Sequence, residues 1–406
     1  MRGPAVHPIV IAAGGTGGHF FPAEALASEL LARGRRIVLL CDARSAGLQS
    51  PVFAGHERFV IHGAGIAGRG VWRGAAAMAG LARGVVQARG ILARLDAAAI
   101  VAFGGYPSVA PVLAARLLGG RRTGGRLHGG RLEGGRRPGG RLPVILHEQN
   151  AVLGRANRFL ARHATVLALS FASTERVPED AATVLTGNPV RPAVAALADG
   201  GYVPPTEAVH LLVLGGSLGA RVFSDVVPAA VALLPADFRA RLSIVQQCRA
   251  EDLERVRAAY VRSGVAAELS SFFPDVAARL AAAHLVISRA GASSVAELAV
   301  AGRPAILVPL PNAIDDHQSA NARALVAARG ASAIAQRDLT PALLAEQVAL
   351  LLGAPDMLAH AAHAARSVAC ADAASRLADL VESVMQRELS SFDDAGHAGP
   401  ATGTRA

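Results

Sequence analysis

The chain of 406 residues contains no lysine, and all 41 of its basic residues are arginines. Its three cysteines, Cys41, Cys248 and Cys370, are far apart and show no metal-ligand spacing. An odd, scattered set of this kind argues against a disulfide framework and indicates a reducing compartment. Aromatic residues make up only 4% of the chain. These are too few to accompany the arginines as a base-stacking surface, so we expect no nucleic-acid partner.

Long apolar runs are also missing. No segment holds 18 consecutive apolar residues, so the sequence predicts no transmembrane helix. The apolar run Ile9–Ala13 is too short for a signal peptide. A hydrophobic content of 52% over this length still provides for a large core and for two or three domains.

Positive charge is concentrated in the first half of the chain, although the formal net charge of the whole is only +10. Residues 1–190 contain 23 arginines and 10 acidic residues, which gives +13. Residues 191–406 contain 18 arginines and 21 acidic residues, which gives −3. This asymmetry predicts that the first half faces an anionic partner, and the scarcity of aromatics favours a membrane surface over nucleic acid.

The most informative stretch is Ala283–Leu298. Its apolar run Leu285–Ile287 predicts a buried parallel strand, a tight loop follows at Arg289–Gly291, and a helical pattern begins at Ser293. The free N–H groups and the positive dipole at such a helix start suit a phosphate. Glu297, about one turn inside the helix, can accept both hydroxyls of a ribose. The stretch therefore predicts a nucleotide site.

Two more strand–glycine loop–helix units occur, at Gly14–His19 and Gly215–Ala220. The first does not follow the G-x-G-x-x-G pattern of nicotinamide sites, and we expect no cofactor. The turn-rich segment TGNPVRP at 186–192 and a change in composition predict a domain boundary there. We therefore expect two doubly wound α/β domains around a cleft, residues 1–190 and 191–388, followed by a disordered tail at 389–406.

Polar residues follow two further strands of the first half, at Gly104–Ser108 and at His147–Asn150, where open α/β sheets bind ligands. Residues 71–95 show a helical pattern in which an apolar face is edged with arginines. Such a helix suits either the domain core or a membrane surface, and Trp72 beside a glycine-rich loop is the better candidate for membrane contact.

Residues 119–143 consist of five tandem copies of a GGRxx pentapeptide, which carry seven arginines and one glutamate. The glycine pairs predict a flexible coil, and the apolar residues are too few for a core. We interpret this insert as an expansion inside a surface loop of the first domain.

Seven motifs follow one another along the chain: GGTGGHFFPA, AFGGYPSVAP, HEQN, GNPVR, GGSLGAR, SRAGASSVAE and DDHQSANA. In this order the chain resembles the bacterial N-acetylglucosaminyltransferases of peptidoglycan synthesis, over about residues 9–383. The resemblance implies a GT-B fold, two Rossmann-like domains facing a central cleft. It implies the donor UDP-N-acetylglucosamine on the second domain. It also implies that the first domain holds lipid I, the acceptor converted to lipid II, at the cytoplasmic face of the inner membrane, where the enzyme is peripheral.

The resemblance also implies the substrate-binding residues, matched motif by motif. They are Thr16, Gly17, Gly18, Tyr106, Asn150, Asn157, Arg191, Ser217, Phe273, Ala292, Ser293, Ser294, Val295, Ala296, Glu297 and Gln318. The sequence departs from the family at Phe273-Pro274, where Ile-Asp is usual, and at Ser224, where Asn is usual. No D-x-D motif occurs in residues 1–390, so we expect helix N-termini and arginines, without a metal, to meet the charge of the leaving group.

The implied reaction inverts the anomeric carbon, because the donor is α-linked and the product is β-linked. It needs one base to take the proton of the acceptor hydroxyl. The candidates are His19, in a loop that should face the cleft, and Glu148, at a strand end. We favour His19 because an imidazole ordinarily titrates near the working pH. Either residue could instead be structural, His19 as a helix cap and Glu148 as an acceptor for loop N–H groups.

Three other functions fit parts of this pattern. They are a glycosyltransferase that builds a glycolipid on diacylglycerol, a UDP-N-acetylglucosamine epimerase of the same fold, and an inactive membrane-binding scaffold. The HEQN and GGTGGH motifs favour lipid I over diacylglycerol. The basic first half argues against the epimerase, and the complete donor motifs argue against the scaffold.

Overall fold

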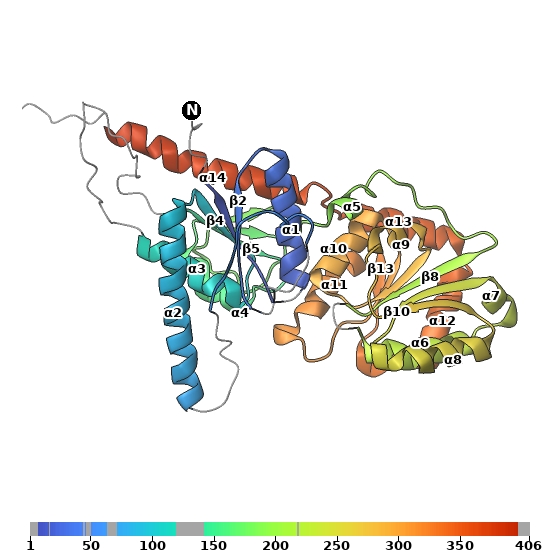
Figure 1. The fold of residues 1–406 in the computed structure, drawn as a ribbon. Coiled ribbons are helices and arrows are strands. Elements are labelled where there is room, and N and C mark those ends of the chain that lie inside the picture. Colours follow the sequence, from blue (N-terminus) through green and yellow to red (C-terminus); the bar gives the residue numbers. More distant parts are fainter. Residues whose placement is uncertain are drawn as a thin grey trace, which may run out of the picture.

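The computed structural model describes residues 7–15, 17–43, 45, 50–62, 71–118, 142–216 and 219–396. These residues form two lobes, each built on a parallel sheet with helices against it (Figure 1). Thr16, Ser217 and most of the GGRxx insert lie outside the described residues.

The first lobe contains a sheet of seven strands. In chain order they are β1 (Ile9–Ala12), β2 (Ile37–Cys41), β3 (Arg58–Val60), β4 (Ala99–Ala102), β5 (Val144–Glu148), β6 (Val166–Leu169) and β7 (Thr183–Leu185). Their order in the sheet is β3-β2-β1-β4-β5-β6-β7, and all neighbours are parallel. The helices are α1 (Gly17–Ala32), α2 (Val71–Leu95), α3 (Tyr106–Leu118), α4 (Arg155–Leu160) and the 3-10 helix η1 (Ala161–His163).

The second lobe contains a parallel sheet of six strands in the order β10-β9-β8-β11-β12-β13. They are β8 (Val209–Leu214), β9 (Leu242–Gln247), β10 (Ala266–Ser270), β11 (Leu285–Ser288), β12 (Ala305–Leu307) and β13 (Ala331–Ala333). Its α-helices are α5 (Pro192–Ala195), α6 (Arg221–Leu233), α7 (Ala236–Arg241), α8 (Leu253–Ser263), α9 (Val276–Ala282), α10 (Ala292–Ala301), α11 (His317–Ala327), α12 (Pro341–Leu352) and α13 (Pro355–Ser367). Its 3-10 helices are η2 (Ala250–Asp252), η3 (Ile314–Asp316) and η4 (Gln336–Asp338).

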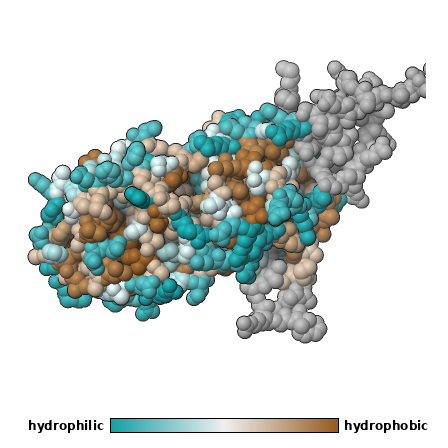
Figure 2. All heavy atoms as spheres, turned by 180° about the vertical axis from the view of Figure 1, so that it is seen from behind, coloured by the Kyte–Doolittle hydropathy of each residue, from teal (hydrophilic) through white to brown (hydrophobic). Residues whose placement is uncertain are grey.

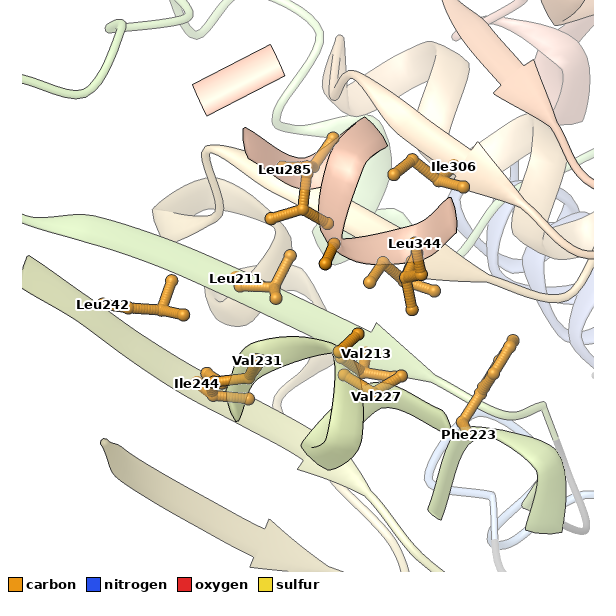
Figure 3. Close-up of a cluster of buried hydrophobic side chains, with 14 of the residues drawn as sticks. Leu211, Val213, Phe223, Val227, Val231, Leu242, Ile244, Leu285, Ile306 and Leu344 are labelled. Atoms are coloured by element: carbon orange, nitrogen blue, oxygen red, sulfur yellow. The ribbon is translucent and has the colours of Figure 1, made fainter. Parts of the chain in front are cut away.

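Central strands read as continuous apolar runs because helices cover both of their faces. In the second lobe, Leu211 and Val213 of β8 pack against Phe223 and Val227 of α6 and against Leu344 of α12 (Figure 3). Each fully buried side chain of this kind contributes about 1.5–3 kcal/mol to stability. In both sheets the strand order reverses beside the first strand of the lobe, at β1–β4 and at β8–β11. The predicted pair of doubly wound domains is confirmed.

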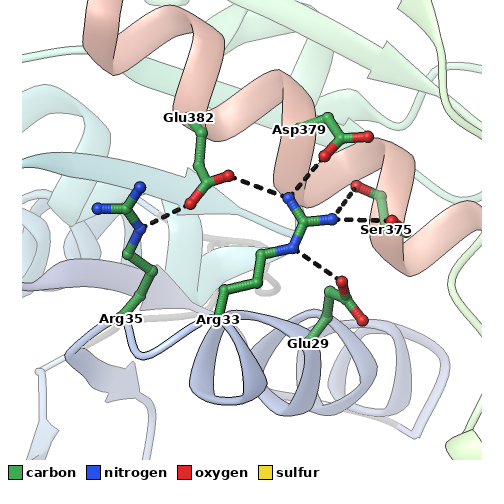
Figure 4. Close-up of polar contacts among 6 residues, drawn as sticks. All are labelled: Glu29, Arg33, Arg35, Ser375, Asp379 and Glu382. Carbon is green, nitrogen blue, oxygen red and sulfur yellow. Dashed lines mark hydrogen bonds and ion pairs between the residues drawn. The ribbon is translucent and has the colours of Figure 1, made fainter.

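The last helix, α14 (Ala373–Gly396), belongs with the first lobe. Its residues Leu377 and Val381 lie in one hydrophobic cluster with the first sheet and α1 (Figure 1). Arg33, at the end of α1, donates to Asp379 and Glu382 of α14 (Figure 4). The predicted second domain, 191–388, is therefore wrong from residue 373 onward. An apolar helical stripe shows that a helix must be covered, but not by which sheet.

Two element boundaries also differ from the predictions. Because proline suits a first helical turn, the pattern predicts a helix start near Pro22, but α1 begins at Gly17. This places His19 in the first turn of the helix. We predicted disorder from residue 389, but α14 continues to Gly396. Residues 397–406 lie outside the described residues.

Candidate active site

The first glycine loop lies close against the edge of its sheet. A Cβ atom on Gly14 would lie 2.7 Å from the hydroxyl of Ser45, so only glycine fits. The N–H of Gly15, at a φ of 86°, donates to the same hydroxyl at 2.5 Å. Gly17 and the exposed Gly18 then form the start of α1. The N–H groups at a helix start lack intrahelical partners and suit an anion.

His19 is hydrogen-bonded to the HEQN segment that ends β5. Its Nδ1 lies 2.8 Å from Oε1 of Gln149. The Nε2 atom of Gln149 lies 2.8 Å from Nδ1 of His147 and donates to the His147 carbonyl at 3.0 Å. Nε2 of His147 lies 3.0 Å from the carbonyl oxygen of Gly187. Burial lowers the pKa of His147 to about 4, so this ring is neutral at working pH.

The carboxylate of Glu148 is enclosed by donors. It is buried and accepts from the backbone N–H groups of Asn150 at 3.0 Å and Gly154 at 2.9 Å. It also accepts from the side-chain amides of Asn150 at 3.1 Å and Asn157 at 2.9 Å. These four bonds match the structural alternative for Glu148, an acceptor that orders the loop after β5.

Two predicted substrate residues of the first lobe differ in their access. Tyr106, at the start of α3, is 38% exposed. Asn157 of α4 is 2% exposed, and its side-chain nitrogen also donates to the His147 carbonyl at 3.2 Å. The structure therefore places Asn157 as a support for Glu148, away from the surface that a substrate would reach.

In the second lobe, Glu297 and Arg191 are paired through two hydrogen bonds. Both N–O distances, Nε to Oε1 and Nη2 to Oε2, are 2.9 Å. The Arg191 guanidinium also lies 5.0 Å from the ring centroid of Phe21, which belongs to α1 of the first lobe. Glu297, the predicted ribose ligand, thus lies at the junction of the two lobes, and Arg191 holds both of its carboxylate oxygens.

The start of α10 carries the remaining donor residues. Gly291 caps this helix without a side-chain hydrogen bond, so the first N–H groups of Ala292, Ser293 and Ser294 have no side-chain cap. Val295 is buried in the core beneath, and Ala296 is partly buried beside it. Gln318, on α11, accepts at Oε1 from the N–H groups of Ala290 at 3.2 Å and Leu310 at 2.9 Å. The loop before α10 and the side chain of Gln318 are therefore fixed to each other.

Two residues of the departures from the family pattern, Phe273 and Ser224, are buried. The ring of Phe273 is buried, with the guanidinium of Arg279 4.0 Å from its centroid. Because the Phe273 ring is buried against Arg279, its main-chain atoms remain for the predicted uracil contact. Ser224, on α6, is 1% exposed.

Asn321, which the sequence analysis did not single out, joins the two lobes. It is fully buried on α11, accepts from the N–H of Ala151 at 2.8 Å, and donates to the side chain of Asn150 at 3.1 Å. Gln149 and His147 were also missed as functional candidates. Both lie inside quoted motifs, and their spacing of two along an extended segment points to one side of the strand end. This spacing of two was the sequence signal that could have paired His147 with Gln149.

The described residues contain no group of three or more His, Cys, Asp or Glu side chains that could hold a metal ion. Across the same residues, no single helix is long and apolar enough to span a membrane, although α12 and α13 meet that criterion as a pair bent by 93°.

Comparison with known proteins places this site in a family. Residues 9–123 match the glycosyltransferase family 28 N-terminal domain, and residues 210–377 match the C-terminal domain of the same family. The chain is 60% identical over 383 residues, 94% of each chain, to the UDP-N-acetylglucosamine--N-acetylmuramyl-(pentapeptide) pyrophosphoryl-undecaprenol N-acetylglucosamine transferase of Granulibacter bethesdensis. It is 52% identical to the protein of that name from Acidiphilium cryptum, over 96% of this chain and all of the relative.

The solved structures agree with this. The crystal structure of MurG from Acinetobacter baumannii superposes with a TM-score of 0.70 at 29% identity, over 93% of this chain and 99% of that one. The family expected from the seven motifs is confirmed. The chain belongs to the UDP-N-acetylglucosamine--N-acetylmuramyl-(pentapeptide) pyrophosphoryl-undecaprenol N-acetylglucosamine transferases of glycosyltransferase family 28, with a GT-B fold.

Proposed function

We propose that this chain transfers N-acetylglucosamine from UDP-N-acetylglucosamine to the C4 hydroxyl of the muramoyl sugar of lipid I, which yields lipid II. The observation that carries the proposal is the 60% identity, over 94% of both chains, to a relative whose name states this donor and this acceptor. The alternative functions, on diacylglycerol or as an epimerase, lack a comparable relative among those described above.

The donor would lie at the start of α10. Glu297 has both oxygens oriented by Arg191, and a carboxylate oxygen has a second lone pair with which to accept from a ribose hydroxyl. The diphosphate would then lie near the uncapped N–H groups of Ala292–Ser294, where the helix dipole favours negative charge. Phe273 would contribute main-chain atoms to the uracil. Thr16 and Ser217, also proposed as donor contacts, lie outside the described residues.

The proposed base is His19. In the step it assists, the acceptor oxygen attacks the anomeric carbon and its proton passes to Nε2 of the imidazole. The bond from that carbon to the diphosphate breaks, and its electron pair leaves with UDP. Glu148 is a weaker candidate because four hydrogen bonds already engage its carboxylate. A base must present a free lone pair to the substrate, and Nε2 of the half-buried His19 makes no hydrogen bond among the described residues.

We also propose that the first lobe binds the anionic surface of the cytoplasmic face of the inner membrane. Figure 2 shows hydrophobic and hydrophilic areas alternating on the face opposite that of Figure 1. In the first lobe, Phe159 is 46% exposed, with the Arg162 guanidinium 5.1 Å from its ring centroid. Leu117 is also exposed near the end of α3, as is Met78 on α2. Apolar side chains beside arginines suit a headgroup interface. The side chain of Trp72 lies outside the described residues.

A reconstituted assay tests the reaction. Purified protein, labelled UDP-N-acetylglucosamine and lipid I in vesicles should give labelled lipid II. Diacylglycerol in place of lipid I should give no labelled lipid, and donor alone should give no epimerised sugar nucleotide. Labelled diacylglycerol, or an epimer formed without any acceptor, would replace the proposal with one of the alternatives.

A further inference from the structure

We infer that Gln149 and His147 act as positioning residues that fix the proton of His19 on Nδ1, so that Nε2 faces the substrate as an acceptor. The inference rests on the proposed function of His19 as the base. It follows from two main-chain carbonyls, because each carbonyl oxygen can only accept a hydrogen bond.

The first carbonyl is that of His147. The side-chain atom of Gln149 that faces it, 3.0 Å away, must be the nitrogen, because an oxygen there would meet another acceptor. The amide of Gln149 therefore has one orientation. Its oxygen points to Nδ1 of His19 at 2.8 Å, and that nitrogen must carry the hydrogen.

The second carbonyl is that of Gly187. Nε2 of His147, 3.0 Å away, must donate to it, so the neutral ring of His147 has a lone pair on Nδ1. That lone pair accepts the second hydrogen of the Gln149 amide at 2.8 Å. Every donor in the chain from Gly187 to His19 thus has an acceptor, and with neutral imidazole rings no other assignment of the protons avoids placing two acceptors against each other.

The rest of the His19 ring is left open to the substrate. Its Nε2 has no hydrogen-bond partner among the described residues, and Gly105 lies beside it. A Cβ on Gly105, whose φ is 68°, would lie 3.6 Å from this nitrogen. When Nε2 receives the acceptor proton, the Nδ1 hydrogen bond to Gln149 remains unchanged. His19 can therefore gain and lose a proton at Nε2 while its hydrogen bond to Gln149 stays in place.

An amide behind the imidazole also differs chemically from a carboxylate. It orients the ring and selects the tautomer, but it carries no charge to stabilise the imidazolium.

The test compares Gln149→Leu, Gln149→Glu and His19→Ala in the lipid II assay. Gln149→Leu should lower kcat about tenfold or more at every pH while the Kd for UDP stays unchanged. Gln149→Glu should also lower kcat, because one carboxylate oxygen would then face the His147 carbonyl, where only a donor fits. In the double variant His19→Ala/Gln149→Leu, kcat should fall no further than in His19→Ala alone. The matched control is Gln87→Leu, which removes the 3.1 Å contact of another glutamine with His62 and should change none of these values.

A spectroscopic measurement separates the positioning role from the identity of the base. With ¹⁵N-labelled histidine, the wild type should show a His19 signal with a protonated Nδ1, and Gln149→Leu should shift it toward the other tautomer. If His19→Ala abolishes turnover but Gln149→Leu keeps full kcat and the same tautomer, the positioning role is wrong and the base assignment stands. If His19→Ala keeps kcat, the proposed base fails, whatever the tautomer signal shows.

Discussion

Arg191 and Glu297 form a two-bond ion pair at the junction of the lobes, with both N–O distances at 2.9 Å. The pair connects two motifs, GNPVR and SRAGASSVAE, that lie 106 residues apart in the chain. The pair orients the carboxylate that we assign to the ribose. Nucleotide binding can test that assignment without an activity assay.

The Glu297→Gln variant should bind UDP-N-acetylglucosamine more weakly, because it loses a charged hydrogen bond of about 1.5–3 kcal/mol. Titration calorimetry with UDP and with 2′,3′-dideoxy-UDP localises the effect. The loss should be large for UDP and small for the dideoxy nucleotide. An equal loss for both nucleotides would show that the substitution disturbs the site generally, and an unchanged Kd would remove the ribose assignment.

His19→Ala and Glu148→Gln should have different consequences. His19→Ala should lower kcat by about 100-fold or more with donor affinity retained, because it removes the base. Glu148→Gln places an amide nitrogen among four donors, so it should lower the free energy of unfolding by about 1–3 kcal/mol. Thermal unfolding and steady-state kinetics on both variants provide the comparison. A stable Glu148→Gln protein with a 100-fold lower kcat would reverse the two roles.

Acid should destabilise the protein through His147. Its folded-state pKa of about 4 lies below the ordinary value of 6.5, so the unfolded chain binds more protons between these values. The free energy of unfolding should be fully retained above pH 6.5 and fall as the pH drops toward 4, by up to about 3 kcal/mol from this group. Urea unfolding at pH 7 and pH 5 should show a smaller pH dependence in His147→Gln. The exposed His56→Gln is the control and should behave like the wild type.

Arg33→Ala should loosen α14. Arg33 donates to Glu29, Asp379, Glu382 and Ser375, and its side chain is 22% exposed. Because several partners share one guanidinium and are partly screened by water, we expect a loss of about 1–2 kcal/mol. Thermal melting and limited proteolysis near residue 372 should both detect this loss of stability. Arg36→Ala, which removes an exposed ion pair with Glu57, is the control and should cost less than about 1 kcal/mol.

Deleting residues 119–138 of the insert should leave the melting temperature and soluble donor turnover nearly unchanged. The deletion would join α3 to β5 through a connection of ordinary length, and loop closure costs only about 0.6 kcal/mol per doubling. Vesicle pelleting at low and high salt tests the arginines, with a full-length variant that carries serine at the seven arginine positions as the control. A deletion protein that fails to fold would show that the insert belongs to the domain.

The sequence predicted the strands well because parallel strands covered on both faces read as short apolar runs. The apolar run Ile37–Cys41 coincides with β2, and the helical pattern at Val71–Leu95 coincides with α2 to the residue. Gly302 ends α10 with a φ of 61°, as a helix C-cap glycine should. Periodicity and glycine placement are local properties, so a single sequence carries them.

The unpredicted parts depend on contacts between distant residues. Neither the 346-residue separation between Arg33 and Asp379 nor the 130-residue separation between His19 and Gln149 leaves a local pattern. The role of Glu148 was open in the sequence because a carboxylate at a strand end looks the same whether it faces a substrate or four donors. Only the fold shows which groups surround it.

The position of α14 has a consequence for the order of synthesis. The core of the first lobe includes Leu377 and Val381, which leave the ribosome after every strand of the second sheet. The lobe that is translated first can therefore close its core only after the other lobe has been made, and until then an apolar strip along α1 faces solvent. A fragment cut at residue 190 would keep that strip exposed permanently. A fragment that could fold by itself would need α14 joined to it through a linker in place of the second lobe.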